Sequence, residues 1–375
     1  MVLLIGNYLP DQQQSMLRFN AMMLNGLRDI GQDVQIIRPP AFFGTIGALG
    51  STIGKWLAYI DKFILFRVRL WRALARKPAV VHICDHSNAM FSRSCRGFPV
   101  VVTCHDLLAV RGGLGEPTDC PASRSGKVLQ RWIVSGLECA KAIRCISDAT
   151  TDDARRLLKV REGIPDIATI EVGLNYPYQK LPDAIVGERL SRINGVNAGE
   201  RYVIHVGSNL RRKNREGVLR IFAKCAEELN AKMVFVGEAL NESLRALAQE
   251  LGITERIVQI PGADDEALEA LYNGSYALLF PSRFEGFGWP IIEAQACGCP
   301  VLCSSSGPMG QVAGLGALLR LPEDEAGFVA DLLKLKDPSE HAQLSQRALE
   351  NSKRYSSAEM IAKYRALYHS LAPSC

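Results

Sequence analysis

Short, continuously apolar segments recur along this sequence of 375 residues and alternate with segments of helical periodicity. The first series comprises Val2–Ile5, Val34–Ile37, Val80–Ile83 and Val100–Thr103, and the second comprises Tyr202–Val206, Met233–Val236, Ile257–Ile260, Tyr276–Phe280 and Val301–Cys303. Apolar runs of this length are typical of strands that are buried on both faces, and strands that alternate with helices form parallel sheets. The sequence therefore predicts an α/β protein with two doubly wound parallel sheets.

Turn-forming residues cluster at 173–182, between the two series of strands. The chain is roughly twice the length of a typical domain. Its hydrophobic content of 47% is sufficient for two separate cores. We therefore expect one domain over residues 1–175 and a second over residues 180–355.

Several classes of protein are disfavoured by the composition. Met1 leads directly into an apolar run without a basic leader, so we expect no signal peptide and a cytoplasmic location. No apolar stretch reaches the length that a membrane span requires. The excess of basic residues is concentrated in one segment, and no groove-reading motif is present, so we expect no nucleic-acid partner.

Two glutamates, Glu285 and Glu293, follow the predicted strand Tyr276–Phe280. Residues 286–289 are glycine-rich and end the strand, and Pro290 suits the first turn of a helix. Glu285 is thereby placed in a loop at the carboxyl end of a strand, and Glu293 one turn into a helix. The amides at such a helix start face the crevice where α/β sheets bind anions. The pattern favours a polyhydroxylated, phosphate-bearing ligand; the alternative is an exposed loop charge and a capping charge.

Three consecutive cations, Arg211, Arg212 and Lys213, follow the predicted strand Tyr202–Val206. An amphipathic helix is expected after them, over about Arg215–Leu229. Arginine forks and a lysine point charge can together neutralise a diphosphate. The alternative interpretation is a solvated basic turn.

The region from Glu285 to Val301 resembles the signature of glycosyltransferase family 4. These are retaining enzymes that use nucleotide sugars and have the GT-B architecture, in which two Rossmann-like domains face a central cleft. The resemblance rests on Glu285-Gly286-Phe287-Gly288 and on Glu293-Ala294-Gln295-Ala296-Cys297-Gly298-Cys299-Pro300-Val301. It implies a catalytic Glu285 against the donor sugar, a sugar-binding loop of Gly286, Phe287, Gly288 and Trp289, and a Glu293 that binds the nucleotide ribose. Trp289 replaces the leucine that is more usual in the family.

The basic segment resembles the family element Val-Gly-x-x-x-x-Arg-Lys-Asn, which is frequent among mannosyltransferases. The resemblance implies that Arg212 and Lys213 hold the donor diphosphate and stabilise its charge in place of a metal. Ser208 stands where other members have an arginine, so the guanidinium comes from Arg211 or Arg212. We expect no metal and no cofactor beyond the nucleotide-sugar substrate.

The N-terminal half offers weaker matches. His105-Asp106-Leu107 follows a predicted strand, and the resemblance implies that His105 is a catalytic residue near the donor sugar. His82 and His86 compete for that role, and His86 is also a candidate on the acceptor side. The first loop lacks the glycine pair of the family, and Ser15 is instead the candidate cap that places helix amides at the donor phosphate. A final helix at about 356–375 is expected to cross back to the first domain, which binds the acceptor.

The segment Lys55–Lys77 matches no family motif. Its residues Lys55, Lys62, Arg69 and Arg76 recur every seven positions and would form a slowly drifting basic stripe on a helix, with Trp56 and Trp71 elsewhere on its circumference. Residues 1–178 carry a net charge of +7 and the remainder −2. The helix either makes a peripheral contact with an anionic inner membrane face or packs on the sheet with a solvated basic edge.

Together these features predict a metal-independent, retaining hexosyltransferase. We expect it to transfer a sugar, with mannose from GDP-mannose favoured, to a hydroxyl of a glycan or lipid-linked acceptor in polysaccharide assembly. The alternatives are a related sugar phosphorylase, a nucleotide-sugar epimerase, and a non-catalytic two-domain sugar-binding protein.

Overall fold

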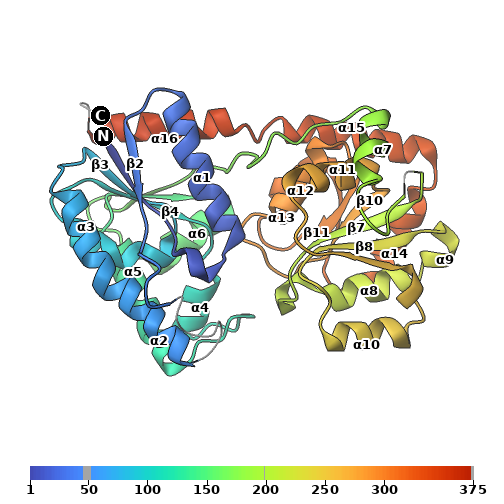
Figure 1. The fold of residues 1–375 in the computed structure, drawn as a ribbon, viewed down its shortest axis with the longest axis horizontal. Coiled ribbons are helices and arrows are strands. Elements are labelled where there is room, and N and C mark those ends of the chain that lie inside the picture. The colour runs from blue at the N-terminus through green and yellow to red at the C-terminus, as the bar shows by residue number, and fades with distance from the viewer. Residues whose placement is uncertain (45–51, 198, 373–375) are drawn as a thin grey trace. The chain divides into compact units, whose positions relative to one another are not determined.

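The computed structural model describes residues 1–44, 52–197 and 199–372, without the side chains of Thr52, Ile53 and Lys55 (Figure 1). The chain divides into two compact units. The N-terminal unit comprises Met1–Asn175 and Ser356–Cys375, and the C-terminal unit comprises Tyr176–Tyr355. The division falls within the turn-rich stretch at 173–182.

The N-terminal unit is built on a six-stranded sheet with the order β2-β1-β3-β4-β5-β6, in which every neighbouring pair is parallel. The strands are β1 (Val2–Ile5), β2 (Val34–Ile37), β3 (Val80–Ile83), β4 (Val100–Cys104), β5 (Ala142–Cys145) and β6 (Asp166–Thr169). The four predicted strands are present, because continuous apolar runs are what a sheet covered on both faces requires.

Helices cover both faces of this sheet (Figure 1). They are α1 (Gln14–Asp29), α2 (Thr52–Ile60), α3 (Phe66–Leu74), α4 (Leu108–Leu114), α5 (Arg124–Leu137), α6 (Asp148–Leu157) and α16 (Ser357–Leu371), with a 3-10 segment at His86–Cys95. Phe66 and Leu70 of α3 and Ile133 of α5 share one core with alternate strand residues such as Leu3. On the other face, Tyr368 of α16 bonds to the sheet.

The C-terminal unit has its own six-stranded parallel sheet, with the order β12-β11-β10-β7-β8-β9. Its strands are β7 (Tyr202–Gly207), β8 (Lys232–Gly237), β9 (Ile257–Ile260), β10 (Ala277–Phe280), β11 (Val301–Ser304) and β12 (Ala317–Arg320). Its helices are α7 (Asp183–Leu190), α8 (Arg215–Ala223), α9 (Ala226–Leu229), α10 (Glu242–Glu250), α11 (Asp265–Gly274), α12 (Trp289–Ala296), α13 (Met309–Ala313), α14 (Glu325–Lys334) and α15 (Pro338–Ser352). The expected α/β class with two doubly wound parallel sheets is confirmed.

Two predicted helices differ in detail. The helix expected over Arg215–Leu229 is two helices, α8 and α9, because Cys225 leaves helical geometry with φ −131°. Its thiol lies within hydrogen-bond distance of the carbonyl oxygens of Ile221 and Phe222 at the break.

The basic helix is also interrupted. A π-helical turn, Asp61–Leu65, joins α2 to α3, and α3 ends at Leu74. The predicted stripe therefore fails, because the wider turn changes the helical phase and Arg76 lies beyond the helix. Lys62 pairs with Asp11 at 2.5 Å, and Arg76 donates to Gln35 at 2.9 Å.

Candidate active site

The first predicted glutamate is buried between two cations. Glu285 is 6% exposed, and its Oε2 accepts from Nη1 of Arg212 at 2.6 Å. Nζ of Lys213 lies 2.7 Å from Oε1 of the same carboxylate. The alternative of an exposed loop charge is therefore wrong. We call Arg212, Lys213 and Glu285 the charged cluster.

The fold explains why residues so far apart in sequence meet. Arg212 and Lys213 lie in a 3-10 turn that follows β7, and Glu285 lies in the loop that follows β10. Because β7 and β10 are parallel neighbours, their carboxyl ends share one edge of the sheet. Two further bonds join the loops: the amide of Arg283 donates to the carbonyl of Arg212 at 2.7 Å, and Asn214 donates to the carbonyl of Pro281 at 3.0 Å.

The electrostatics of the charged cluster favour an ionised carboxylate. Burial alone would raise the pKa of Glu285, but Lys213 and Arg212 outweigh burial and hold that pKa below its ordinary value. For Lys213, burial lowers the pKa more than Glu285 raises it. Because two cations face one carboxylate, the charged cluster favours the ionised form of Glu285.

The three neighbouring basic residues have different environments. Arg211 is exposed, whereas Arg212 reaches Glu285 and also donates to the carbonyl of Phe284. Arg215, which the sequence analysis did not assign, is buried and donates to the carbonyls of Gly207 and Glu238, each at 2.6 Å. It joins the carboxyl end of β7, which leads to the charged cluster, to the carboxyl end of β8. The only signal for it in the sequence was the run of basic residues to which it belongs.

The glycine loop leads into α12 as predicted. Gly288 caps the helix with φ +104°, a conformation that favours glycine, and Pro290 lies in the first turn. Phe287 is buried and packs edge-to-face on Tyr355 at 5.5 Å. The indole Nε1 of Trp289 is buried, and the structure gives it no hydrogen-bond partner.

The second predicted glutamate faces inward. Glu293 is 3% exposed, and its Oε2 accepts from the hydroxyl of Tyr272 at 3.0 Å. Burial and the carboxylate of Glu293 raise the pKa of Tyr272 well above its ordinary value, so this hydroxyl stays a donor. Tyr272 was not foreseen, because it precedes the signature by more than ten residues. The ribose role of Glu293 stays a prediction.

In the N-terminal unit, His105 follows β4 and is 4% exposed. Its Nε2 lies 2.9 Å from the carbonyl oxygen of Cys84, so that nitrogen carries the hydrogen and donates it. Burial lowers the pKa of His105, and the nearby Asp85 carboxylate offsets this only in part. The imidazole is therefore neutral and has one acceptor nitrogen.

The two competing histidines separate clearly. His82 is fully buried in β3, within hydrogen-bond distance of Tyr368 and Thr103 at 2.6 and 2.8 Å, so it ties α16 to the sheet. His86 is partly exposed, with Nδ1 3.2 Å from Oδ1 of Asp85. Asp85, which the sequence analysis did not single out, is buried and also accepts from Asn7.

The predicted cap at Ser15 is wrong. The helix begins at Gln14, and its cap residue is Gln13, whose side chain makes no capping bond. Ser15 is exposed and lies inside the first turn. Its own amide is one of the first helical amides that a cap residue would bind. Its proposed contact with the donor phosphate has lost its structural basis.

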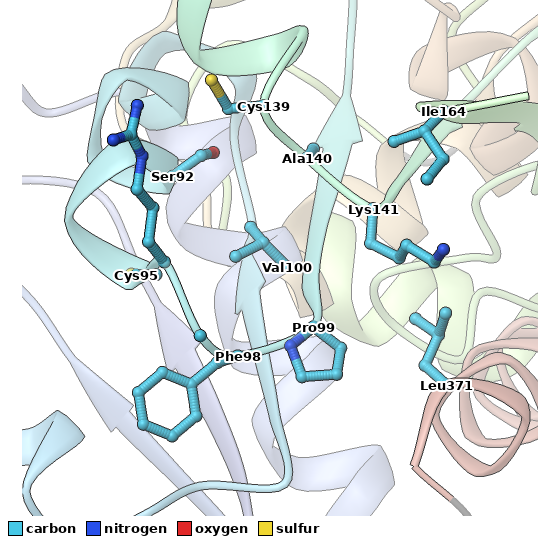
Figure 2. Close-up of a pocket in the computed structure, with 12 residues that line it drawn as sticks. Ser92, Cys95, Phe98, Pro99, Val100, Cys139, Ala140, Lys141, Ile164 and Leu371 are labelled. Atoms are coloured by element: carbon cyan, nitrogen blue, oxygen red, sulfur yellow. The ribbon is translucent and has the colours of Figure 1, made fainter. Parts of the chain in front are cut away.

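A cavity of about 400 Å³ lies at the other edge of the N-terminal sheet, where β4 and β5 begin. Figure 2 shows the residues that line it. Ser92, Cys139 and Lys141 are among its lining residues, and none of the predicted site residues lines it. Among the described residues, no cluster of three or more His, Cys, Asp or Glu side chains is arranged to hold a metal ion. Over the same described ranges, no helix combines the length and apolarity that would span a membrane.

Two family models match this chain. The model for glycosyl transferases group 1 matches residues 187–356, and the model for glycosyltransferase family 4 matches residues 18–173. The two matches fall one in each unit. The chain belongs to glycosyltransferase family 4.

Three proteins show what this chain is similar to. The chain is 25% identical to the N-acetyl-alpha-D-glucosaminyl L-malate synthase of Bacillus anthracis, over 67% of this chain but only 65% of the relative. It is 26% identical to the O-antigen chain mannosyltransferase B of Escherichia coli, over 82% of this chain and 80% of that one. The sucrose-phosphate synthase structure from Thermosynechococcus elongatus superposes with a TM-score of 0.79 at 18% identity, covering 100% of this chain and 99% of that one. This last likeness concerns the fold, which is GT-B with two Rossmann-like domains.

Proposed function

We propose that this glycosyltransferase moves a sugar, with retention of configuration, from a nucleoside diphosphate to a hydroxyl of a glycan or lipid-linked acceptor. The charged cluster is the observation that carries the proposal. It places a guanidinium, an ammonium and a buried carboxylate at one sheet edge, beside the start of α12. A diphosphate needs the two cations, and a sugar hydroxyl needs the acceptor oxygens.

The reaction follows from these groups. Arg212 and Lys213 hold the diphosphate and stabilise the negative charge that grows as the bond from the anomeric carbon to the phosphate oxygen breaks. The acceptor hydroxyl attacks the same face of that carbon and gives its proton to the departing phosphate oxygen. Glu285 orients the sugar through its hydroxyls. The two cations supply the charge that a metal would otherwise provide.

Other predicted residues have supporting roles in this proposal. The loop of Gly286, Phe287, Gly288 and Trp289 presents its backbone to the sugar, and Glu293 accepts from the ribose. His105 supplies a neutral imidazole for the sugar. Its acceptor nitrogen suits a hydroxyl rather than a phosphate.

GDP-mannose is the donor that we favour. The Arg212-Lys213-Asn214 element supports it through its resemblance to mannosyltransferases, and so does the relative named as an O-antigen chain mannosyltransferase. We propose assembly of a polysaccharide as the context. The protein would act in the cytoplasm, peripherally at the inner membrane face, where lipid-linked acceptors are exposed.

The two enzymatic alternatives would use the same cations. A sugar phosphorylase would need inorganic phosphate as the attacking group, and a nucleotide-sugar epimerase would leave the nucleotide attached. A sugar-binding protein would bind without turnover. Each of these outcomes is distinct from transfer to an acceptor or to water.

A panel of nucleotide sugars tests the proposal. GDP-mannose, UDP-glucose and UDP-N-acetylglucosamine are each incubated with the protein, with and without EDTA, and release of the nucleoside diphosphate is followed. We expect donor-selective release that survives EDTA, with GDP-mannose fastest and a product of unchanged anomeric configuration by NMR. Release that requires inorganic phosphate, or binding without release for every donor and acceptor, would contradict the proposal.

A further inference from the structure

Large apolar side chains are exposed along one helical segment of the N-terminal unit. Trp56 is 68% exposed and Trp71 is 71% exposed, while Ile64 and Val68 are 60% and 50% exposed. Figure 1 shows α2 and α3 as one long helix at the margin of this unit. Burying these side chains elsewhere would be favourable, so a face that keeps so many of them in water calls for a binding partner.

Ile64, Val68 and Trp71 share one side of the helix. In α3, Val68 and Trp71 lie within an arc of roughly 60°, and Ile64 falls in the same arc about one turn earlier. Leu70 and Phe66 point the opposite way and are fully buried in the core of the unit. The exposed apolar residues are therefore a second face of a helix whose first face is already packed. We call Trp56, Tyr59, Ile64, Val68 and Trp71 the outer face.

Aromatic contacts hold the α2 end of the outer face in place. Trp56 packs edge-to-face on Tyr59 with ring centroids 5.8 Å apart, and Tyr59 lies 5.5 Å from Phe63. Phe63 in turn contacts Trp132 of α5 at 5.2 Å. These contacts join the α2 end of the outer face to the folded unit.

The charged residues that border the outer face are all positive. Arg67 and Arg72 fall on its two sides, and Arg69 lies further round; all three are exposed. Within the described residues, no acidic side chain pairs with any of them. The only acid between residues 52 and 77 is Asp61, which is fully buried and accepts from the hydroxyl of Tyr8 at 2.6 Å.

We infer that the outer face docks on a lipid bilayer that carries anionic headgroups. Tryptophans suit the boundary between headgroups and acyl chains, and the bordering arginines meet lipid phosphates. A second copy of the chain fits less well, because an interface between identical faces would set arginine beside arginine. The contact differs from the predicted basic stripe: Arg67 and Arg72 replace Lys62, which is paired within the unit.

The inference deepens the proposed location of the enzyme but does not depend on turnover. It is tested by sedimentation with phosphatidylcholine vesicles, with and without phosphatidylglycerol. The Trp56→Ser/Trp71→Ser variant should lose at least about tenfold in partitioning, because each tryptophan gives up apolar burial. The matched control is Val128→Ser/Leu315→Ser, which removes two exposed apolar residues from other elements, 66% and 85% exposed.

A second variant tests the charges. Arg67→Gln/Arg72→Gln should abolish the preference for phosphatidylglycerol and the sensitivity of binding to salt. GDP-mannose hydrolysis in the absence of vesicles should be unchanged in every variant, so a failure of docking is distinct from a failure of the proposed chemistry. Lack of binding by the parent protein, equal loss in the control, or a dimer that depends on Trp56 and Trp71 would overturn the inference.

Discussion

The carboxyl-end edges of the two sheets carry contrasting polar groups. In the C-terminal unit, that edge holds two cations and one buried carboxylate, held by ion pairs of 2.6 and 2.7 Å. In the N-terminal unit, it holds a neutral His105 and a carboxylate, Asp85, whose partners are hydrogen-bond donors such as Asn7 and Ser87. In the proposed function, the first edge would bind a diphosphate and the second would bind hydroxyl groups. The two sheets share one architecture, so the difference between the edges comes from a few loop residues.

The largest effect should come from Glu285→Gln, which removes the charge of the carboxylate and keeps its size. Transfer should fall on the order of a thousandfold, because an electrostatic contact to the reacting sugar is lost. The variant should also lose about 3 kcal/mol of unfolding free energy, since two partly buried cations are left without a counter-charge.

A diphosphate should rescue the stability of that variant but not its activity. Added GDP should raise the melting temperature of Glu285→Gln more than that of the parent, because it supplies the missing negative charge. Glu325→Gln is the matched control: Glu325 also pairs with two cations, Arg220 and Lys224, at 2.6 and 2.9 Å. If GDP raised the melting temperature of both variants equally, the charged cluster would behave as an ordinary ion pair and not as a diphosphate site.

Replacing either cation of the charged cluster should have the next largest effect on transfer. Lys213→Ala should lower kcat/KM roughly a hundredfold, because its charge matters more as the phosphate departs than in the bound donor. Arg212→Ala should have a similar effect, whereas its exposed neighbour Arg211→Ala should remain near the parent. Steady-state kinetics with GDP-mannose give the comparison. A large effect at Arg211 and none at Arg212 would reassign the guanidinium.

The hydroxyl-binding edge should show a smaller effect. His105→Ala should reduce transfer about tenfold, the value of one neutral hydrogen bond, and His86→Ala should affect only the KM of the acceptor. Rates with varied donor and varied acceptor separate the two. If His86→Ala lost donor turnover while His105→Ala kept it, the roles of the two histidines would be exchanged.

The last prediction concerns the dependence of stability on pH. Burial lowers the pKa of His82 in one unit and of His205 in the other to about 3. The unfolded chain binds these protons below about pH 6.5 and the folded units do not, so stability falls as pH falls from 6.5 towards 3. His82→Gln should reduce this slope by about one proton, roughly 1.4 kcal/mol per pH unit. A slope unchanged in urea unfolding would show that His82 is protonated in the folded unit.

Much of the fold was predictable because its signals are local. Val2–Ile5, Val34–Ile37 and Val80–Ile83 are strands at the expected residues, since a buried parallel strand must be apolar throughout. The loop position of Glu285 followed from the strand before it and from Pro290 after it. The meeting of both loops at one sheet edge could be expected, but the pairing of Glu285 with Arg212 and Lys213 depends on side-chain packing across more than seventy residues.

The errors in the predicted basic helix come from contacts between residues that are far apart in the sequence. The basic stripe assumed an undisturbed α-helix, whereas Asp61 is drawn into the unit by Tyr8 and the amides of Phe42, Phe43 and Gly44, in a π-helical turn. Lys62 was expected to face solvent or a membrane, but its ammonium pairs with Asp11, fifty-one positions away. Such long-range partners leave no periodic trace in a sequence.

The most direct test of the central claim is a crystal structure of the protein with GDP bound. The account predicts diphosphate oxygens within about 2.7–3.2 Å of Nζ of Lys213 and of the Arg212 guanidinium, with the Glu285 carboxylate turned from these cations towards the sugar site. A diphosphate held elsewhere, for instance beside Lys141 in the cavity at the opposite edge of the N-terminal sheet, with the Glu285 ion pairs undisturbed, would contradict it.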